Sequence, residues 1–345
     1  MKARQFNCLT ALLLCVLASM AGAQPAASPE ESRAADELPE ADTGTALERS
    51  EELSRRLADL EEITSRVGIY DVSLIEAYRD LAGFYAEQGE HEAAADSLRE
   101  ALQLTRINAG LNSPQQEVIL DQIIDNVSAM EDWQSADDAQ HLKLYVVNRN
   151  FSPDDPEYLS AVEEYGAWKL RVIRENLLRL NSREIGREAE LLSDHYAEAI
   201  AGIDAVQPVS NTGLLPLLYG KSQADMMIAR YLAETPYQYF PGTVSQYVNE
   251  TVCSNVRDAS GNVVRSCYTV QRENPRYRQS QQDAKRLAVM RSQRQVEYTV
   301  DRLQAILDSH PDMPVAQRME VELRIGEMLA ESRRIVQVSR RGSLF

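Results

Sequence analysis

Residues 75–101 read IEAYRDLAGFYAEQGEHEAAADSLREA. Apolar and small residues recur at three- and four-residue steps on both sides of Gln88-Gly89-Glu90, which indicates two amphipathic helices. Gly89 can adopt the positive φ angle that a tight helix exit needs. We therefore expect one helix around residues 73–87 and a second around 91–106, joined by a short turn.

Eight residues of this stretch have the spacing of a known repeat signature: Tyr78, Leu81, Ala82, Tyr85, Gly89, Ala94, Leu98 and Ala101. The spacing resembles the W-x2-LG-x2-Y … A-x3-F-x2-A pattern of the tetratricopeptide repeat (TPR) superfamily. The resemblance implies an α-solenoid of helical hairpins, a fold that binds proteins or peptides rather than performing chemistry.

A second, weaker copy of the pattern follows 42 residues later, where Ile123, Ile124, Val127, Trp133 and Ala136 stand at matching positions. Pro114 closes the first unit and Pro156 closes the second. This period resembles the kinesin-light-chain-like branch of the superfamily. A third shift agrees only in part, and residues 157–180 read as one long helix. We expect a helical repeat region over residues 46–182, capped by flanking helices because few units are present.

Residues 183–345 form the expected C-terminal region, mainly α-helical, with helices at 184–202, 213–233, 279–308 and 313–336. Alternating β-branched and aromatic residues interrupt it at 237–271, which predicts a β-hairpin insertion. A three-residue loop ending at Gly261 pairs residues whose numbers sum to 520, and this register places Cys253 opposite Cys267. The two cysteines should therefore face each other about 4.5–5.5 Å apart between Cα atoms, within disulfide range.

The N-terminus has the pattern of an export signal. Lys2 and Arg4 precede the apolar run Leu9–Leu17, and Ala21-Gly22-Ala23 offers a cleavage site after Ala23. Residues 1–23 are thus predicted as a signal peptide of an exported, periplasmic bacterial protein. Residues 24–45 are acidic and nearly free of large apolar groups, which predicts a disordered linker. Cleavage would leave Cys253 and Cys267 as the remaining cysteines, and export favours their oxidation.

The chain carries 53 acidic and 36 basic residues, a formal net charge of −17. Because a nucleic-acid-binding protein needs a basic surface, this charge argues against that class. The sequence shows no later segment apolar enough to span a membrane.

We find no signature of catalysis. The four histidines, His91, His141, His195 and His310, have no metal-site spacing, and no GxSxG, Walker or GxGxxG motif occurs. We therefore predict no catalytic residue, no cofactor and no metal, and classify the chain as a non-enzyme.

Two surfaces are candidates for binding. TPR units expose the first helix of each pair on their concave face, so the resemblance implies that this face carries Glu76, Arg79, Glu87, Asp121, Asp125 and Ser128. The Lys and Asn residues with which some TPR domains hold a C-terminal carboxylate are absent, and the acids favour a neutral or basic partner. The same face could instead be filled by the flanking helices. The second candidate is an aromatic surface of Tyr237, Tyr239, Phe240 and Tyr247, which could equally pack the hairpin onto the helices.

The sequence therefore predicts an exported TPR-like protein-interaction or scaffolding module of the cell envelope. One alternative is a periplasmic binding protein for a small ligand or a polysaccharide that uses the aromatic hairpin surface. A more distant one is an envelope hydrolase.

Overall fold

The computed structural model describes residues 40–206 and 211–341. Among these residues the backbone divides into two units, with the division between Glu52 and Leu53. The predicted signal peptide and residues 24–39 of the predicted linker lie outside the described residues. Helix α1 spans Glu40–Val67, so the last residues of the predicted linker, 40–45, are helical.

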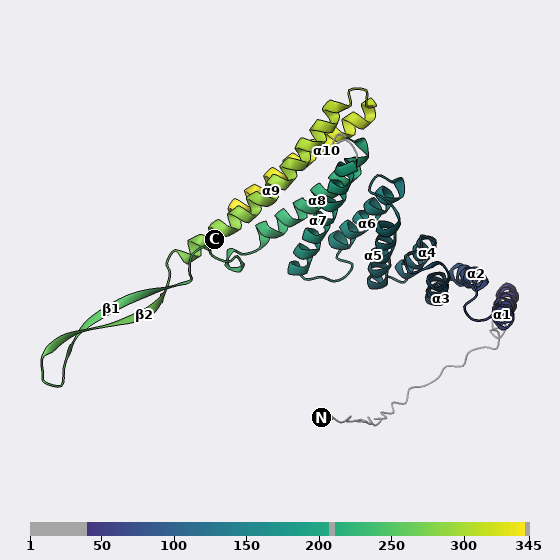
Figure 1. The fold of residues 1–345 in the computed structure, drawn as a ribbon, viewed down its shortest axis with the longest axis horizontal. Coiled ribbons are helices and arrows are strands. Elements are labelled where there is room, and N and C mark those ends of the chain that lie inside the picture. Colours follow the sequence, from purple (N-terminus) through teal and green to yellow (C-terminus); the bar gives the residue numbers. More distant parts are fainter. Residues whose placement is uncertain (1–39, 207–210, 342–345) are drawn as a thin grey trace, which may run out of the picture. The chain divides into compact units, whose positions relative to one another are not determined.

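The repeat region consists of two helical hairpins, as the sequence predicts. The first pairs α2 (Ser73–Glu87) with α3 (His91–Ala109), and the second pairs α4 (Gln116–Ala129) with α5 (Trp133–Asn150). Gly89 has a φ of 76° at the first turn, a conformation that favours glycine. Each of these four helices packs against the next, from α2 to α5, which is the arrangement of a TPR-like α-solenoid (Figure 1).

Small residues hold the first hairpin together. Ala94, Ala95 and Ala101 are fully buried on α3, and Ala82 is buried on α2. Because an alanine side chain is short, the helix backbones can approach closely at these positions. The same apolar cluster continues through α4 and α5 and includes Trp168 and Val172 of the following helix.

The predicted helix at 157–180 is shorter than expected. Helix α6 spans Pro156–Glu175 and α7 begins at Ser182, ending at Val206. Asn176 ends α6 in the left-handed conformation with a φ of 51°. Its side-chain Oδ1 accepts a hydrogen bond from the Leu180 amide at 2.7 Å, which stabilises the turn. Asparagine tolerates this conformation better than most residues, so it can end a helix without glycine.

Three further helices complete the helical part of the described chain. They are α8 (Leu215–Glu234), preceded by the short 3₁₀ helix η1 (Thr212–Leu214), then α9 (Tyr277–Ser309) and α10 (Val315–Arg341). Helix α8 packs against α7, α9 and α10, and α9 and α10 lie side by side (Figure 1). Their apolar residues form a second core cluster with those of α6 and α7.

Tyr196 of α7 fills the space between α6 and α8. Its ring is buried, and a Cβ atom added to Gly166 or to Gly220 would overlap it. Both glycines are therefore required by close packing rather than by backbone conformation.

The β-hairpin has the predicted register. Strands β1 (Tyr247–Arg257) and β2 (Val263–Glu273) are antiparallel, and Cys253 lies opposite Cys267. These cysteines form a disulfide with Cα atoms 4.0 Å apart, slightly closer than expected. The loop closes through the Asp258 amide, which donates to the Asn262 carbonyl at 2.9 Å, and Gly261 has a φ of 85°.

The boundary predicted for the hairpin, 237–271, is wrong at its start. Residues Tyr237–Tyr239 form the short 3₁₀ helix η2, which packs against α9 instead of entering a strand. The amide of Gln281 on α9 donates to the carbonyls of Gln238 and Phe240, each at 3.1 Å. These side-chain donors satisfy backbone groups that a strand ladder would otherwise use.

Candidate functional site

The candidate face begins with a row of carboxylates on α4. Glu117, Asp121 and Asp125 are spaced by four residues, so they project from one side of the helix. Asp125 is exposed, whereas the other two are partly buried. Glu117 is not among the residues predicted for the binding face, but it lies on the same side of α4 as Asp121 and Asp125.

A buried lysine of the next helix, Lys143, forms an ion pair with one acid of this row. The Nζ atom of Lys143 on α5 donates to Asp121 at 2.5 Å and to Glu164 of α6 at 2.8 Å. The lysine side chain is only 11% exposed, but those of Asp121 and Glu164 are 47% and 46% exposed. Burial alone would lower the pKa of Lys143, but its two carboxylate partners outweigh burial and raise it. The ammonium is thus held charged between α4 and α6.

The negative charges of the other two acids on α4, Asp125 and Glu117, are not fully balanced by Lys143. Burial raises the pKa of Asp125, and the charges of Asp121 and Glu164 raise it further against the opposing effect of Lys143. Burial also raises the pKa of Glu117, again opposed by Lys143. A raised carboxyl pKa means that the negative form is disfavoured as the site stands. An additional positive charge near these acids would therefore be stabilised.

Helix α2 adds a neighbouring polar row. Arg79 forms an ion pair with Glu76 at 2.9 Å, and its Nε donates to Gln122 of α4 at 3.2 Å. The second contact joins this ion pair to α4, the helix that carries the row of acids. Glu87 is exposed and Ser128 is partly buried, and both lie in the last turns of their helices. We call the set Glu76, Arg79, Glu117, Asp121, Asp125 and Glu164 the acidic face.

The residues of the TPR signature lie beneath this surface. Leu81, Ala82, Ala94, Leu98 and Ala101 are buried, and Tyr78 and Tyr85 pack against the same cluster. Their positions are those of packing residues. His91 Nδ1 lies 2.9 Å from Asn126 Oδ1 and so links α3 to α4.

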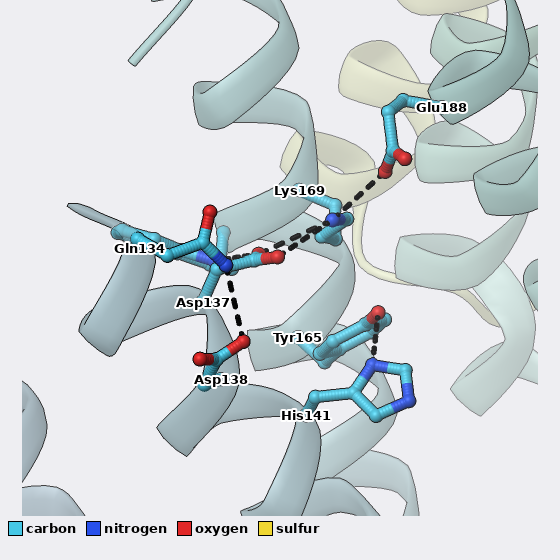
Figure 2. A network of polar contacts seen from close by, with 8 residues as sticks. Gln134, Asp137, Asp138, His141, Tyr165, Lys169 and Glu188 are labelled. Carbon is cyan, nitrogen blue, oxygen red and sulfur yellow. Dashed lines mark hydrogen bonds and ion pairs between the residues drawn. The ribbon is translucent and has the colours of Figure 1, made fainter. Parts of the chain in front are cut away.

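A second lysine network lies between α5 and α7 and has no sequence motif. Lys169 of α6 contacts Asp137 of α5 at 3.2 Å and Glu188 of α7 at 2.9 Å (Figure 2). The indole N–H of Trp168 also donates to Asp137, at 2.8 Å. Lys169 is 9% exposed and its two partners are 16% and 24% exposed. Burial opposes its charge, but Glu188 and Asp137 raise its pKa. This network is less exposed than the acidic face and serves mainly to hold the helices together.

The rings of His141, Tyr165 and His195 contact one another in sequence near the Lys169 network. His141 Nδ1 contacts the hydroxyl of Tyr165 (Figure 2). The two atoms are 3.0 Å apart, and Tyr165 packs edge-on against His195. The Nε2 atom of His195 is buried without a hydrogen-bond partner in the described part of the chain. Burial, together with the nearby His141, lowers the pKa of His195 to about 4. His195 is therefore a neutral packing residue at physiological pH.

The four residues of the predicted aromatic surface lie on different elements of the chain. Tyr237 and Phe240 are partly buried against the helices, whereas Tyr239 is 79% exposed. Tyr247 is the first residue of β1 and is 45% exposed. The structure thus brings Tyr239 and Phe240 together beside α8 but leaves Tyr247 on the hairpin.

Residues 40–206 and 211–341 contain neither a metal-binding cluster nor a membrane-spanning helix. No group of three or more His, Cys, Asp or Glu side chains there could hold a metal ion. No helix of that part of the chain combines the length and apolar character needed to cross a membrane.

Comparison with known proteins gives a likeness of fold only. No family model matches the chain, and no curated protein matches it. Among solved structures it is similar to nearly identical TPR-like repeats assigned to a kinesin light chain of Podosopora anserina. That match has 10% identity and a TM-score of 0.38, covering 53% of this chain and 80% of the other. A point variant of the same repeats matches at 10% identity and a TM-score of 0.37, with the same coverage. The helical hairpins of this chain are assigned from their own packing.

Proposed function

We propose that this chain is an exported, non-catalytic interaction scaffold of the cell envelope that binds a basic segment of another protein on its acidic face. The observation that carries the proposal is the excess of carboxylates around Lys143. Asp125 and Glu117 have raised pKa values because burial and neighbouring acids disfavour their charge. A lysine- or arginine-rich peptide would supply the missing positive charge.

The geometry of the face suits an extended or helical peptide. Its acids come from α4 and α6, and the Arg79–Gln122 contact continues the polar surface to α2. Because the pair Glu76–Arg79 is internally neutral, the negative charge is concentrated on α4 and α6. Lys143 keeps these two helices in register, so the carboxylates are preorganised before a partner arrives.

Export is part of the proposal and rests on two observations. The N-terminal sequence has the signal pattern with cleavage after Ala23, and Cys253–Cys267 is a disulfide. Disulfides persist in oxidising compartments such as the periplasm. Fractionation of cells and N-terminal sequencing of the isolated protein test this part separately.

Binding can be tested with labelled decapeptides, one rich in lysine, one rich in glutamate and one neutral, by fluorescence anisotropy. We expect the basic peptide to bind best and its affinity to fall as salt rises, since exposed charges are screened within about 8 Å at physiological ionic strength. Glu117→Lys with Asp125→Lys should abolish binding. These two changes leave the Lys143 ion pairs with Asp121 and Glu164 intact.

A matched control changes the same net charge elsewhere. Asp301→Lys with Glu322→Lys alters exposed acids of α9 and α10 and should leave binding nearly unchanged. As the pH is lowered, binding of the basic peptide to the wild-type protein should weaken at a higher pH than ordinary carboxyl groups would cause. Because the pKa values of Asp125 and Glu117 are raised, both acids gain protons at a higher pH than ordinary carboxyls and lose their attraction for the peptide. Equal loss of binding in the two double variants would show that only net charge matters, and the acidic face would be rejected.

A further inference from the structure

A second candidate site lies in a hollow of about 510 Å³ between α7, α8 and α9. Its volume is within the range of pockets that bind small molecules, roughly 300–1,000 Å³. None of its lining residues belongs to the acidic face, so it is independent of the function proposed above.

The floor of the hollow is a buried polar triad. The Ser193 hydroxyl donates to Asp225 Oδ1 at 2.6 Å, and Lys221 Nζ donates to Asp225 Oδ2 at 2.8 Å and to Ser193 Oγ at 3.2 Å. All three residues are at least nine-tenths buried. Lysine carries three N–H donors, and these contacts use two of them. Within residues 40–206 and 211–341 the third donor of Lys221 makes no hydrogen bond.

The walls carry opposite charges on opposite helices. Glu190 and Asp194 lie one turn apart on α7, and Arg291 faces the hollow from α9. These three side chains are exposed, and within residues 40–206 and 211–341 no ion pair joins either acid to Arg291. Unpaired charges of both signs along one hollow are complementary to a molecule that itself carries both signs.

The charges of the side chains that line the hollow restrict the chemical class of the ligand further. Lys221 and Asp225 neutralise each other in their own ion pair. The walls then present two negative charges and one positive charge. A ligand with two amino groups and one carboxylate has the complementary set.

We propose that this hollow binds a dibasic amino acid. Its carboxylate lies against Arg291 and the spare N–H of Lys221, and its amino groups lie against Glu190 and Asp194. Ile228 and Leu232, which also line the hollow, provide an apolar surface for the aliphatic chain.

Isothermal titration of the full chain with L-lysine, L-leucine and L-glutamate at low ionic strength tests the proposal. L-lysine should bind saturably at one site, L-leucine more weakly, and L-glutamate least of all. Arg291→Gln and Asp194→Asn should each lower the affinity for L-lysine about tenfold or more, since each removes a charge-assisted contact. Both residues are exposed, so these variants should retain the circular dichroism spectrum of the wild type.

Arg294→Gln is the matched control, because Arg294 is an exposed arginine of the same helix that does not line the hollow. It should leave the affinity unchanged. Absence of heat with L-lysine at millimolar concentration, or equal affinity for L-glutamate, would overturn the proposal. So would L-lysine binding that survives both wall variants. None of these outcomes bears on the acidic face, which the peptide experiment tests by itself.

Discussion

The helices and the β-hairpin of this chain are stabilised by different means. Helices α2 to α8 bury apolar residues against their neighbours in two continuous clusters. In β1 and β2 almost every residue is exposed, and only Val252, Cys253 and Val270 are partly buried. A two-stranded hairpin is marginal in water by itself, so its backbone ladder needs the Cys253–Cys267 bond. We conclude that the helices depend on lateral packing and the hairpin on a covalent cross-link.

The largest expected change in stability follows from removing a buried charge from the helices. Lys169→Met would leave Asp137 and Glu188 mostly buried without their shared counter-charge. We expect the free energy of unfolding to fall by about 2–3 kcal/mol, because an uncompensated buried carboxylate is costly. Denaturant titration followed by circular dichroism measures this loss.

Arg99→Met is the control for that variant. Arg99 pairs with Asp96 at the surface, with side chains 48% and 67% exposed, so its loss should change stability by less than about 0.5 kcal/mol. If both variants unfold at the same denaturant concentration, the Lys169 network does not stabilise the helices.

A second test addresses close packing around Tyr196. Gly220→Ala adds a methyl group where the Tyr196 ring already lies, and we expect a loss of about 1–3 kcal/mol in unfolding free energy. Gly83→Ala, within α2, meets no atom and should instead stabilise by about 0.5–1 kcal/mol, since alanine favours helix. Thermal unfolding of the two variants measures whether each one lowers or raises the free energy of unfolding. A neutral Gly220→Ala would mean that Tyr196 moves aside easily.

The smallest effect on global stability is expected from the hairpin. Replacing Cys253 and Cys267 by serine should accelerate amide exchange in β1 and β2, because the cross-link contributes about 3 kcal/mol to a loop of this size. Unfolding of the helices should stay within about 0.5 kcal/mol of wild type, because the strands bury little surface. Hydrogen exchange with mass spectrometry resolves the two regions. A marked drop in helix protection would show that the hairpin supports the helices after all.

Local rules make much of this fold predictable from the sequence. Gly89 and the periodic alanines predict the first helical hairpin, whose observed helices begin at Ser73 and His91. The register of β1 and β2 follows from one loop ending at Gly261, because alternation then fixes every later pair. The same rules place the start of the hairpin too early, since aromatic residues that favour strands also suit η2 when α9 satisfies their carbonyls.

The polar networks are less predictable because they join distant residues. The sequence places Asp121 on the surface, but no periodicity indicates that Lys143 reaches it from the next helix. The cluster of Ser193, Lys221 and Asp225 likewise has no motif, and only packing of α7 on α8 brings its members together. Their chemistry is general, whereas their proximity depends on the whole fold.

Two of the buried lysines, Lys143 and Lys169, also limit how this repeat region can change. Lys143 lies on α5 but binds acids of α4 and α6, and Lys169 lies on α6 but binds acids of α5 and α7. Each therefore ties together helices that are not consecutive. Removing or duplicating one hairpin would separate an ammonium from one of its carboxylates. Although the helices resemble interchangeable modules, this segment cannot gain or lose a unit by simple recombination without a compensating change in charge.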